Sequence, residues 1–297
     1  MLFSSIDIGS NAVRLFFANV FEIKGKAVSE KASLIRIPLR LGEDVFNSGN
    51  ISESKIENLI KTMKAFKLLL EVYKPLDYIV CATSAMREAL NKEDVVNRIF
   101  KEAGIKIKII DGEEEAHIVC AVNNITVSKK FNIRMYVDVG GGSTEISVVK
   151  DHKLVASSSF NIGTLRLLSD NFDKNEWVKM NTWFNGFKND FGKIYLIGSG
   201  GNINKLSKMY STQLDKSLSY PNLKQGYKHL SDYSLQQRIE QLGLRPDRAD
   251  VIIPASEIFL NIMKITKSDY IFVPRIGLSD GLIYTLYKNY TSTNRAT

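Results

Sequence analysis

A chain of 297 residues, of which 44% are hydrophobic and 24% are charged, is typical of a globular protein long enough to form two domains. No uninterrupted apolar run approaches the length of a membrane span, and the opening stretch Met1–Asp7 lacks the basic start and long apolar core of a signal peptide. We therefore expect a cytoplasmic protein with no membrane partner. The two cysteines, Cys81 and Cys120, form no C-x-x-C pair, so we expect small core residues rather than a zinc site or a disulfide framework.

The net charge of +8 is unevenly distributed along the chain. Residues 1–125 hold 17 basic and 17 acidic side chains, so the whole basic excess falls in residues 126–297. A run of lysines there would attract a polyanion, although an ordinary solvated surface is the preferred explanation for any single lysine. The run consists of Lys188, Lys193, Lys205, Lys208, Lys216, Lys224 and Lys228. No nucleic-acid partner is expected.

The first part of the chain begins with a predicted antiparallel sheet. Its strands are expected at Phe3–Ile8, Val13–Phe21 and Val28–Pro38. The first turn reads I-D-I-G-S-N, so that Asp7 stands between two β-branched residues and is followed by Gly9, Ser10 and Asn11. Apolar residues at helical spacing then predict a helix that begins after Ser52 and ends before Pro75.

Two charged groups follow the next predicted strand, Tyr78–Ala82. Arg87 falls near a strand-to-helix junction, where a guanidinium can bind phosphate oxygens or form a surface salt bridge. After a strand at Lys106–Ile110, the acidic stretch D-G-E-E-E opens a helix that is expected to reach about Thr126. Carboxylates at a helix N-terminus complement the helix dipole, and the residues alone favour that explanation over a catalytic base.

The stretch Tyr136–Val149 repeats the order of the first turn, with an aspartate 131 positions after Asp7. It predicts a strand, a turn at Gly140–Ser143 and a second strand. Glycines without Cβ atoms allow backbone N–H groups to converge on a phosphate oxygen, and Asp138 is a hard oxygen ligand suited to magnesium. Two ordinary turns would explain either loop alone, but the pair favours two related halves, each with an acid and a phosphate-binding loop.

The remaining chain predicts a second alternation of strands and helices. Strands are expected at Leu154–Phe160, Lys193–Ile197 and Tyr270–Val273, and helices at Gly163–Ser169, Glu176–Phe187, within Leu223–Lys267 and at Ser279–Asn289. A third glycine-rich turn, Gly198–Asn202, precedes a helix, where it either holds a nucleotide or phosphate chain or permits close helix–strand packing.

These motifs, in order, are D-I-G-S-N, A-T-S-A-M-R-E-A, G-E-E-E-A, D-V-G-G-G-S-T-E, G-S-G-G and G-L-S-D-G-L. With them the chain resembles the exopolyphosphatase / guanosine pentaphosphate phosphohydrolase (Ppx/GppA) family from Ile6 to Ile283. The resemblance implies an α/β fold of two ribonuclease-H-like domains of the actin/Hsp70/sugar-kinase superfamily, with an active cleft between them. We place the domains at residues 1–125 and 126–297 and allow for the terminal helix to pack back on the first domain.

The resemblance also assigns roles to individual residues. Glu115 matches the catalytic base that activates water, which reverses the preference for a dipole role. Asp138 and Glu145 match acidic positions that serve magnesium, or another divalent metal, and Glu145 is also catalytic. Arg87 is assigned to catalysis and, with the two loops, to phosphate binding. The loop residues are Gly9, Ser10, Asn11, Gly140, Gly141, Gly142 and Ser143.

The expected activity is a metal-dependent hydrolase that releases the terminal phosphate of inorganic polyphosphate, with short chains preferred. The alternatives are a guanosine pentaphosphate hydrolase, a non-catalytic sensor of polyphosphate or an alarmone, and, less favoured, a kinase. Ala12 and Asn202 depart from the family pattern, which keeps the sensor open. We also allow for a homodimer.

Overall fold

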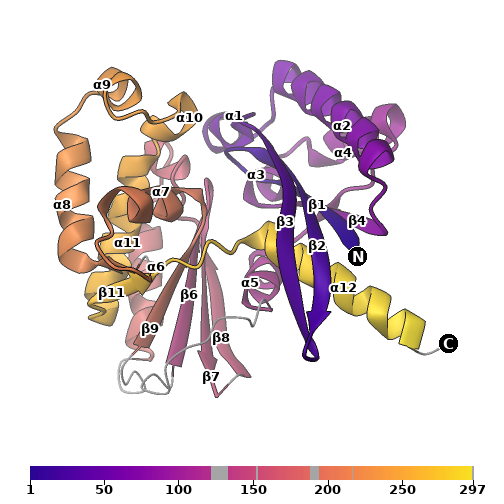
Figure 1. Ribbon diagram of the computed structural model, residues 1–297. Coiled ribbons are helices and arrows are strands. Elements are labelled where there is room, and N and C mark those ends of the chain that lie inside the picture. The colour runs from indigo at the N-terminus through magenta and orange to yellow at the C-terminus, as the bar shows by residue number, and fades with distance from the viewer. Residues whose placement is uncertain (122–132, 152, 188–193, 216, 296–297) are drawn as a thin grey trace. The chain divides into compact units, whose positions relative to one another are not determined.

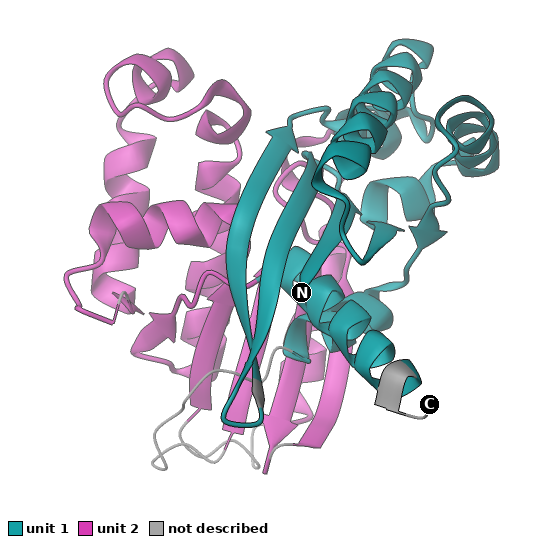
Figure 2. Cartoon of the chain, turned by 45° about the vertical axis from the view of Figure 1, so that its right-hand side comes forward, with its two compact units in different colours: residues 1–124, 277–297 teal, residues 125–276 magenta. Residues whose placement is uncertain are grey.

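The computed structural model describes residues 1–121, 133–151, 153–187, 194–215 and 217–295 (Figure 1). The chain divides into two compact units, which Figure 2 colours separately: unit 1 contains residues 1–124 and 277–297, and unit 2 contains residues 125–276. The terminal helix is expected either to stay with the second domain or to pack back on the first. In the structure this helix, α12 (Leu278–Arg295), is part of unit 1.

Unit 1 is built on a five-stranded sheet in the order β3-β2-β1-β4-β5. The first three strands are antiparallel because short turns join them, whereas β4 and β5 follow helical crossovers and run parallel to β1. The strands are β1 (Leu2–Ile8), β2 (Val13–Ile23), β3 (Lys26–Ile37), β4 (Asp77–Ala82) and β5 (Lys108–Ile109). The other helices of this unit are α1 (Leu41–Ser48), α2 (Glu53–Tyr73), α3 (Ser84–Glu88), α4 (Lys92–Ala103) and α5 (Gly112–Cys120).

Helix α12 completes the core of unit 1. Its Ile283, Leu286 and Tyr287 are buried against Phe3 of β1 and neighbouring residues of β2. Burying each such side chain stabilises the fold by about 1.5–3 kcal/mol. The helix also approaches α5 closely: a Cβ added at Gly281 would lie 2.2 Å from the carbonyl oxygen of Ile118. Only glycine therefore fits at this crossing.

Unit 2 is built on a six-stranded sheet in the order β10-β11-β9-β6-β7-β8. Its strands are β6 (Ile133–Val139), β7 (Thr144–Lys150), β8 (Lys153–Phe160), β9 (Ile194–Ser199), β10 (Leu218–Ser219) and β11 (Tyr270–Phe272). Its helices are α6 (Asn175–Asn185), α7 (Gly201–Tyr210), α8 (Tyr220–Ser231), α9 (Leu235–Glu240), α10 (Pro246–Ala249) and α11 (Ile252–Thr266), with a 3₁₀ turn at Arg166–Leu168. Side chains of α11, including Ile258, Phe259 and Ile262, are fully buried in its core.

The two sheets share one topology. In each unit three antiparallel strands are followed by two parallel ones, so β3-β2-β1-β4-β5 corresponds to β8-β7-β6-β9-β11, and β10 is added antiparallel at the edge of unit 2. This is the ribonuclease-H-like order that the resemblance implied. The predicted α/β fold class of two related domains is confirmed.

Several element boundaries differ from the sequence prediction. The strand expected at Lys106–Ile110 shortens to β5, and the helix expected at Gly163–Ser169 is only the 3₁₀ turn. The helical region within Leu223–Lys267 divides into four helices because Ser234 begins α9 with a capping box and Gly243 adopts a φ of 61° before Pro246. The predicted helix end near Thr126 and the strand start at Lys193 lie outside the described residues. Within the described ranges, no helix combines the length and the apolar content needed to cross a membrane.

Candidate active site

In unit 1 the predicted phosphate loop is the turn between β1 and β2. Asp7 is buried near the end of β1, and the guanidinium of Arg14, its partner across the antiparallel ladder, lies 2.5 Å from its carboxylate. The N–H of Gly9 donates to the carbonyl of Ala12 at 3.1 Å, which closes the turn. Ser10 is buried, and its hydroxyl oxygen accepts a hydrogen bond from the N–H of Ala85 at 3.1 Å. The loop is thus fixed to the start of α3.

Helix α3 also carries Arg87, which bridges two other parts of unit 1. Its Nη1 donates to the carbonyl of Ile110 at 2.9 Å and lies 3.8 Å from a carboxylate oxygen of Glu115. A guanidinium has five N–H donors, so these contacts leave it able to bind further oxygens. The structure therefore brings together two of the predicted catalytic residues, Arg87 and Glu115.

The acidic residues that open α5 have separate environments. Asp111 is the N-cap and accepts from the N–H of Glu114, while the side chain of Glu114 pairs with Lys108. Glu113 is exposed. Glu115 is 8% exposed. A dipole role suits the exposed carboxylates, whereas the buried carboxylate of Glu115 lies beside the guanidinium of Arg87.

The pKa of Cys81 in β4 is influenced by several charged residues of unit 1. The pKa of its thiol is raised to about 12, mainly by burial; Lys108 opposes the rise, and the carboxylates of Asp7, Glu114 and Glu115 contribute to it. The thiol therefore stays protonated at neutral pH, in keeping with the prediction of a core residue. Asp7 and Glu115 therefore both lie within electrostatic range of Cys81 in β4.

In unit 2 two carboxylates lie side by side on the sheet. Asp138 of β6 stands directly opposite Glu145 of β7 in the antiparallel ladder and beside Ser199 of β9 in the parallel one. Directly opposite residues of an antiparallel pair project from the same face of the sheet, with Cβ atoms about 4.5–5.5 Å apart. Glu145 is buried, and Ser159 of β8 donates a hydrogen bond to its Oε1 at 2.9 Å.

The loop between these carboxylates is bonded to the 164–166 segment through its backbone carbonyls. The carbonyl of Gly140 accepts from Thr164, that of Gly141 from Leu165 and Arg166, and that of Gly142 from the guanidinium of Arg166, at 2.7–3.1 Å. In a trans peptide the carbonyl and the following N–H point in opposite directions. The N–H groups of Gly141, Gly142 and Ser143 therefore point away from the 164–166 segment, as an anion-binding nest requires.

Two further glycines allow neighbouring backbone segments to approach the loop and Asp138 closely. A Cβ at Gly163 would lie 2.3 Å from the carbonyl carbon of Gly142, so the 163–166 segment can approach only because this residue is glycine. Gly200, with a φ of 103°, allows the start of α7 to approach Asp138: its Cβ would lie 3.2 Å from Oδ1. The guanidinium of Arg248 lies beside the next residue, Gly201.

Comparison with known proteins shows to which family the chain belongs. The model of the Ppx/GppA phosphatase family matches residues 28–290. The chain belongs to this family. The Ppx/GppA match starts after the first glycine loop and covers both the Arg87–Glu115 pair and the Asp138–Glu145 pair.

Three relatives of this Ppx/GppA chain span most of its length. It is 29% identical to a bifunctional 3-dehydroquinate synthase/phosphatase of Fusobacterium nucleatum over 91% of this chain and 44% of the relative. The crystal structure of an exopolyphosphatase from Cytophaga hutchinsonii aligns with a TM-score of 0.82 at 25% identity, covering 97% of this chain and 98% of that one. A PPX-GPPA enzyme from Aquifex aeolicus aligns with a TM-score of 0.73 at 27% identity, covering 96% and 99%. The chain spans about half the length of the first curated relatives that it matches.

The predicted site residues fall into two groups. Gly9, Ser10, Asn11, Arg87 and Glu115 lie in unit 1, and Asp138, Gly140–Ser143 and Glu145 lie in unit 2. Sequence reasoning missed their supporting residues. Those residues are Arg14, Ser159, Gly163, Arg166 and Arg248. Only Arg14 carried a local signal, since it follows the turn at the position that pairs with Asp7.

The residues of unit 2 fit a magnesium ion. Among the described residues there is no group of three or more histidine, cysteine, aspartate or glutamate side chains that could hold a metal. Magnesium does not need such a cage, because it binds one or two carboxylates and completes its shell with water and phosphate oxygens. Asp138 and Glu145 supply two hard oxygen donors next to the nest, and a cation between them would offset their mutual repulsion.

Proposed function

We propose that this Ppx/GppA chain is an exopolyphosphatase, a metal-dependent hydrolase that removes the terminal phosphoryl group of inorganic polyphosphate, with a preference for short chains. The observation that carries the proposal is the pair of adjacent carboxylates, Asp138 and Glu145, beside a row of backbone N–H donors. Anionic oxygens bound at the N–H groups and a cation bound at the carboxylates together suit a phosphate chain. The exopolyphosphatase of Cytophaga hutchinsonii supports the choice of substrate.

In this reaction a water oxygen attacks the terminal phosphorus, the bond to the bridging oxygen breaks, and the shortened chain leaves with that oxygen. Glu115 takes the proton of the water, a task for a carboxylate that is held in a buried position. Arg87 binds the non-bridging oxygens with the donors not used by Ile110. The N–H groups of Gly141, Gly142 and Ser143 hold phosphate oxygens in unit 2.

The bound metal would neutralise charge on the phosphates and help to orient them, with Asp138 and Glu145 as its protein ligands. Ser159 keeps Glu145 in place by donating to one carboxylate oxygen. The close approach of Gly200 keeps the start of α7 next to Asp138.

The rest of the polyphosphate chain is assigned to basic side chains of unit 2. Within the described residues, Lys205 lies close enough to Lys208 and Arg248 that, after burial, their charges are the next causes of its lowered pKa. Such a cluster attracts a polyanion. Lys188, Lys193 and Lys216 of the predicted lysine run lie outside the described residues.

The test is phosphate release in the presence of magnesium from short polyphosphate, long polyphosphate and guanosine pentaphosphate. Glu115→Gln removes the proposed base and is expected to lower release by roughly 100- to 10,000-fold. Glu113→Gln is the matched control, because Glu113 is exposed on the same helical turn and should retain activity.

Which of the three compounds is hydrolysed discriminates between the remaining candidate functions. Preference for guanosine pentaphosphate would replace polyphosphate with the nucleotide as substrate. If all three compounds bind and none is hydrolysed, the chain is a sensor and the hydrolase proposal is wrong.

A further inference from the structure

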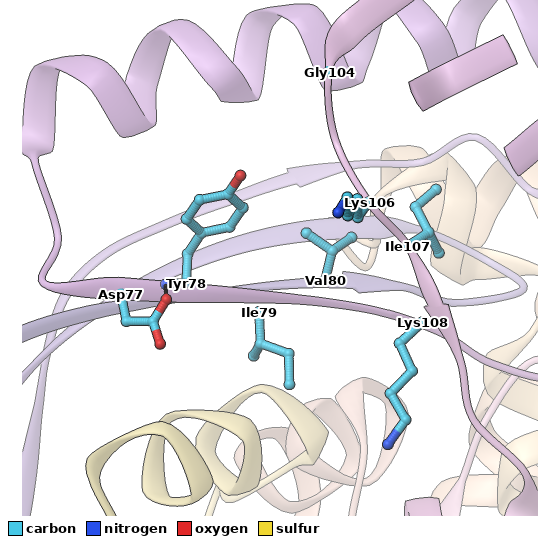
Figure 3. A pocket seen from close by; sticks show the side chains of 8 residues that line it. All are labelled: Asp77, Tyr78, Ile79, Val80, Gly104, Lys106, Ile107 and Lys108. Carbon is cyan, nitrogen blue, oxygen red and sulfur yellow. Dashed lines mark hydrogen bonds between the residues drawn. The ribbon is translucent and has the colours of Figure 1, made fainter. Parts of the chain in front are cut away.

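Unit 1 contains a cavity of about 520 Å³ that no step of the proposed reaction uses (Figure 3). It lies between the first four residues of β4 and the stretch from Gly104 to Lys108 that leads into β5. The cavity arises because β5 pairs with β4 only at Cys81 and Ala82, so the two segments diverge towards their N-terminal ends. Its lining residues are Asp77, Tyr78, Ile79, Val80, Gly104, Lys106, Ile107 and Lys108.

One wall of this cavity is a strand edge with backbone hydrogen-bonding groups. The carbonyl of Ala82 accepts from the N–H of Ile110 on the β5 side of the strand. Peptide groups alternate along a strand, so those of Val80 and Tyr78 face the same side. The N–H of Tyr78 is bound at 2.8 Å by the carboxylate of Asp77 next to it in the chain. Val80 therefore offers the cavity a backbone donor and acceptor.

The same cavity is bordered by ammonium groups. Lys106 and Lys108 line it, and the ammonium of Lys67 lies 2.8 Å from the position of a Cβ at Gly104, on the rim. Lys108 pairs with Glu114, and this hydrogen bond raises its pKa, so it remains charged. Lys106 lies 5.9 Å from the ring centroid of Phe100. Since the charge of Lys108 is offset by Glu114, Lys106 and Lys67 are the ammonium groups that suit an anionic group here.

The cavity also has an aromatic surface. Tyr78 is 41% exposed, and Figure 3 shows its ring on the same side of β4 as Val80 and Lys106. Val80 and Ile107 add apolar lining, whereas Ile79 points to the other side of β4. An inorganic phosphate chain has no aromatic group that could stack on a tyrosine ring, whereas a nucleobase does.

We propose that this cavity binds a mononucleotide. The base stacks on Tyr78 and bonds the backbone of Val80, and the phosphates bind Lys106, with Lys67 at the rim. The volume falls within the range of small-molecule sites, about 300–1,000 Å³. The inference concerns ligand binding in unit 1 and stands whether or not polyphosphate is the substrate.

Calorimetric titration of the full chain with ADP, adenosine and pyrophosphate, without magnesium, tests the proposal. ADP is expected to bind more tightly than either fragment, because it alone has both the base and two phosphates. Tyr78→Ala and Lys106→Glu should each weaken ADP binding roughly tenfold or more, through loss of stacking and of a charge-assisted contact. Lys101→Glu is the matched control, since Lys101 is an exposed lysine of α4 that does not line the cavity.

A second measurement locates the ligand directly. In nitrogen–proton correlation spectra, ADP should shift the amide signals of Tyr78, Val80 and Lys106. Asp138→Asn, in the phosphate-binding region of unit 2, should leave the affinity for ADP unchanged. The proposal is wrong if ADP does not bind, if Lys106→Glu binds it as Lys101→Glu does, or if Asp138→Asn abolishes binding.

Discussion

The two glycine loops occupy equivalent positions in the two units, yet the charges next to them are opposite. In unit 1 the residue across the ladder from Asp7 is Arg14, and the two form an ion pair. In unit 2 the residue across from Asp138 is Glu145. The same backbone topology therefore neutralises one aspartate within the protein and sets the other beside a second carboxylate.

This difference indicates where a cation belongs. A carboxylate paired with a guanidinium has its charge compensated by the fold, and a metal there would have to displace the arginine. Two carboxylates directly opposite each other repel, and a cation bound between them would offset that repulsion. We therefore propose the metal site in unit 2 and treat the Asp7–Arg14 pair as structural support for the first loop.

The largest expected effect comes from breaking the carboxylate pair. Glu145→Gln should lower phosphate release by at least roughly 100-fold, because the phosphate charge is no longer offset by metal. Magnesium at about 100 times its dissociation constant should stabilise the wild type by about 2.7 kcal/mol and the variant far less. Equal magnesium-induced shifts in Tm would contradict the assignment.

The next effect concerns how each loop is anchored. Gly163→Ala inserts a methyl group into the backbone of the unit 2 loop and should reduce the free energy of unfolding by about 3 kcal/mol. Gly277→Ala is the control, because a Cβ there meets no atom within 4 Å, and it should change stability little. Urea denaturation of both variants measures the difference. Equal stability would show that the 163–166 segment moves away readily and does not fix the loop.

Removing Arg14 tests the other side of the comparison. Arg14→Met leaves the buried carboxylate of Asp7 without the guanidinium and should cost about 2 kcal/mol, less than a fully buried pair because the arginine side chain is 32% exposed. Combining it with Asp7→Asn should recover much of the loss. Chemical denaturation of the single and double variants gives the coupling. A single variant as stable as the wild type would mean that the ion pair does not support the loop.

The smallest expected effect concerns Asp280, whose carboxylate is influenced mainly by burial. Burial raises the pKa of Asp280 to about 6, while the N–H of Gly277 and the charge of Lys31 oppose the rise. Because this pKa exceeds the ordinary value of about 3.9, the folded state takes up a proton first, and stability should increase as the pH falls from 7 to 4. Asp280→Asn should be about 1 kcal/mol more stable than the wild type at pH 7 and equal to it near pH 4. Thermal melts across this range test it, and a constant difference would contradict the raised pKa.

The features that the sequence predicted best are those encoded by short stretches. The β-branched residues around Asp7 and Asp138 predict strands, and the following glycines predict turns, so both loops were found with their strands. The pairing of Asp138 with Glu145 follows from the turn itself, because a tight turn fixes which residues of its two strands stand opposite.

Contacts between residues that are far apart in the sequence could not be predicted from any short stretch. Arg166 binds the carbonyl of Gly142, and Gly163 packs on the same peptide, but the sequence suggested only a helix for this segment. The burial that separates Glu115 from Glu113 depends on packing of the whole helix, so a run of three glutamates cannot reveal which one is buried. The catalytic assignments were implied by family resemblance and remain to be tested by the variants above.

Unit 1 is completed by α12, whose Ile283, Leu286 and Tyr287 cover Phe3 near the start of the chain. Unit 2 is encoded entirely between the two segments of unit 1. During synthesis on the ribosome, residues 125–276 emerge as one continuous folding unit, whereas the first 124 residues expose an uncovered apolar surface until the last helix is made. Unit 2 can therefore fold before the core of unit 1 is complete.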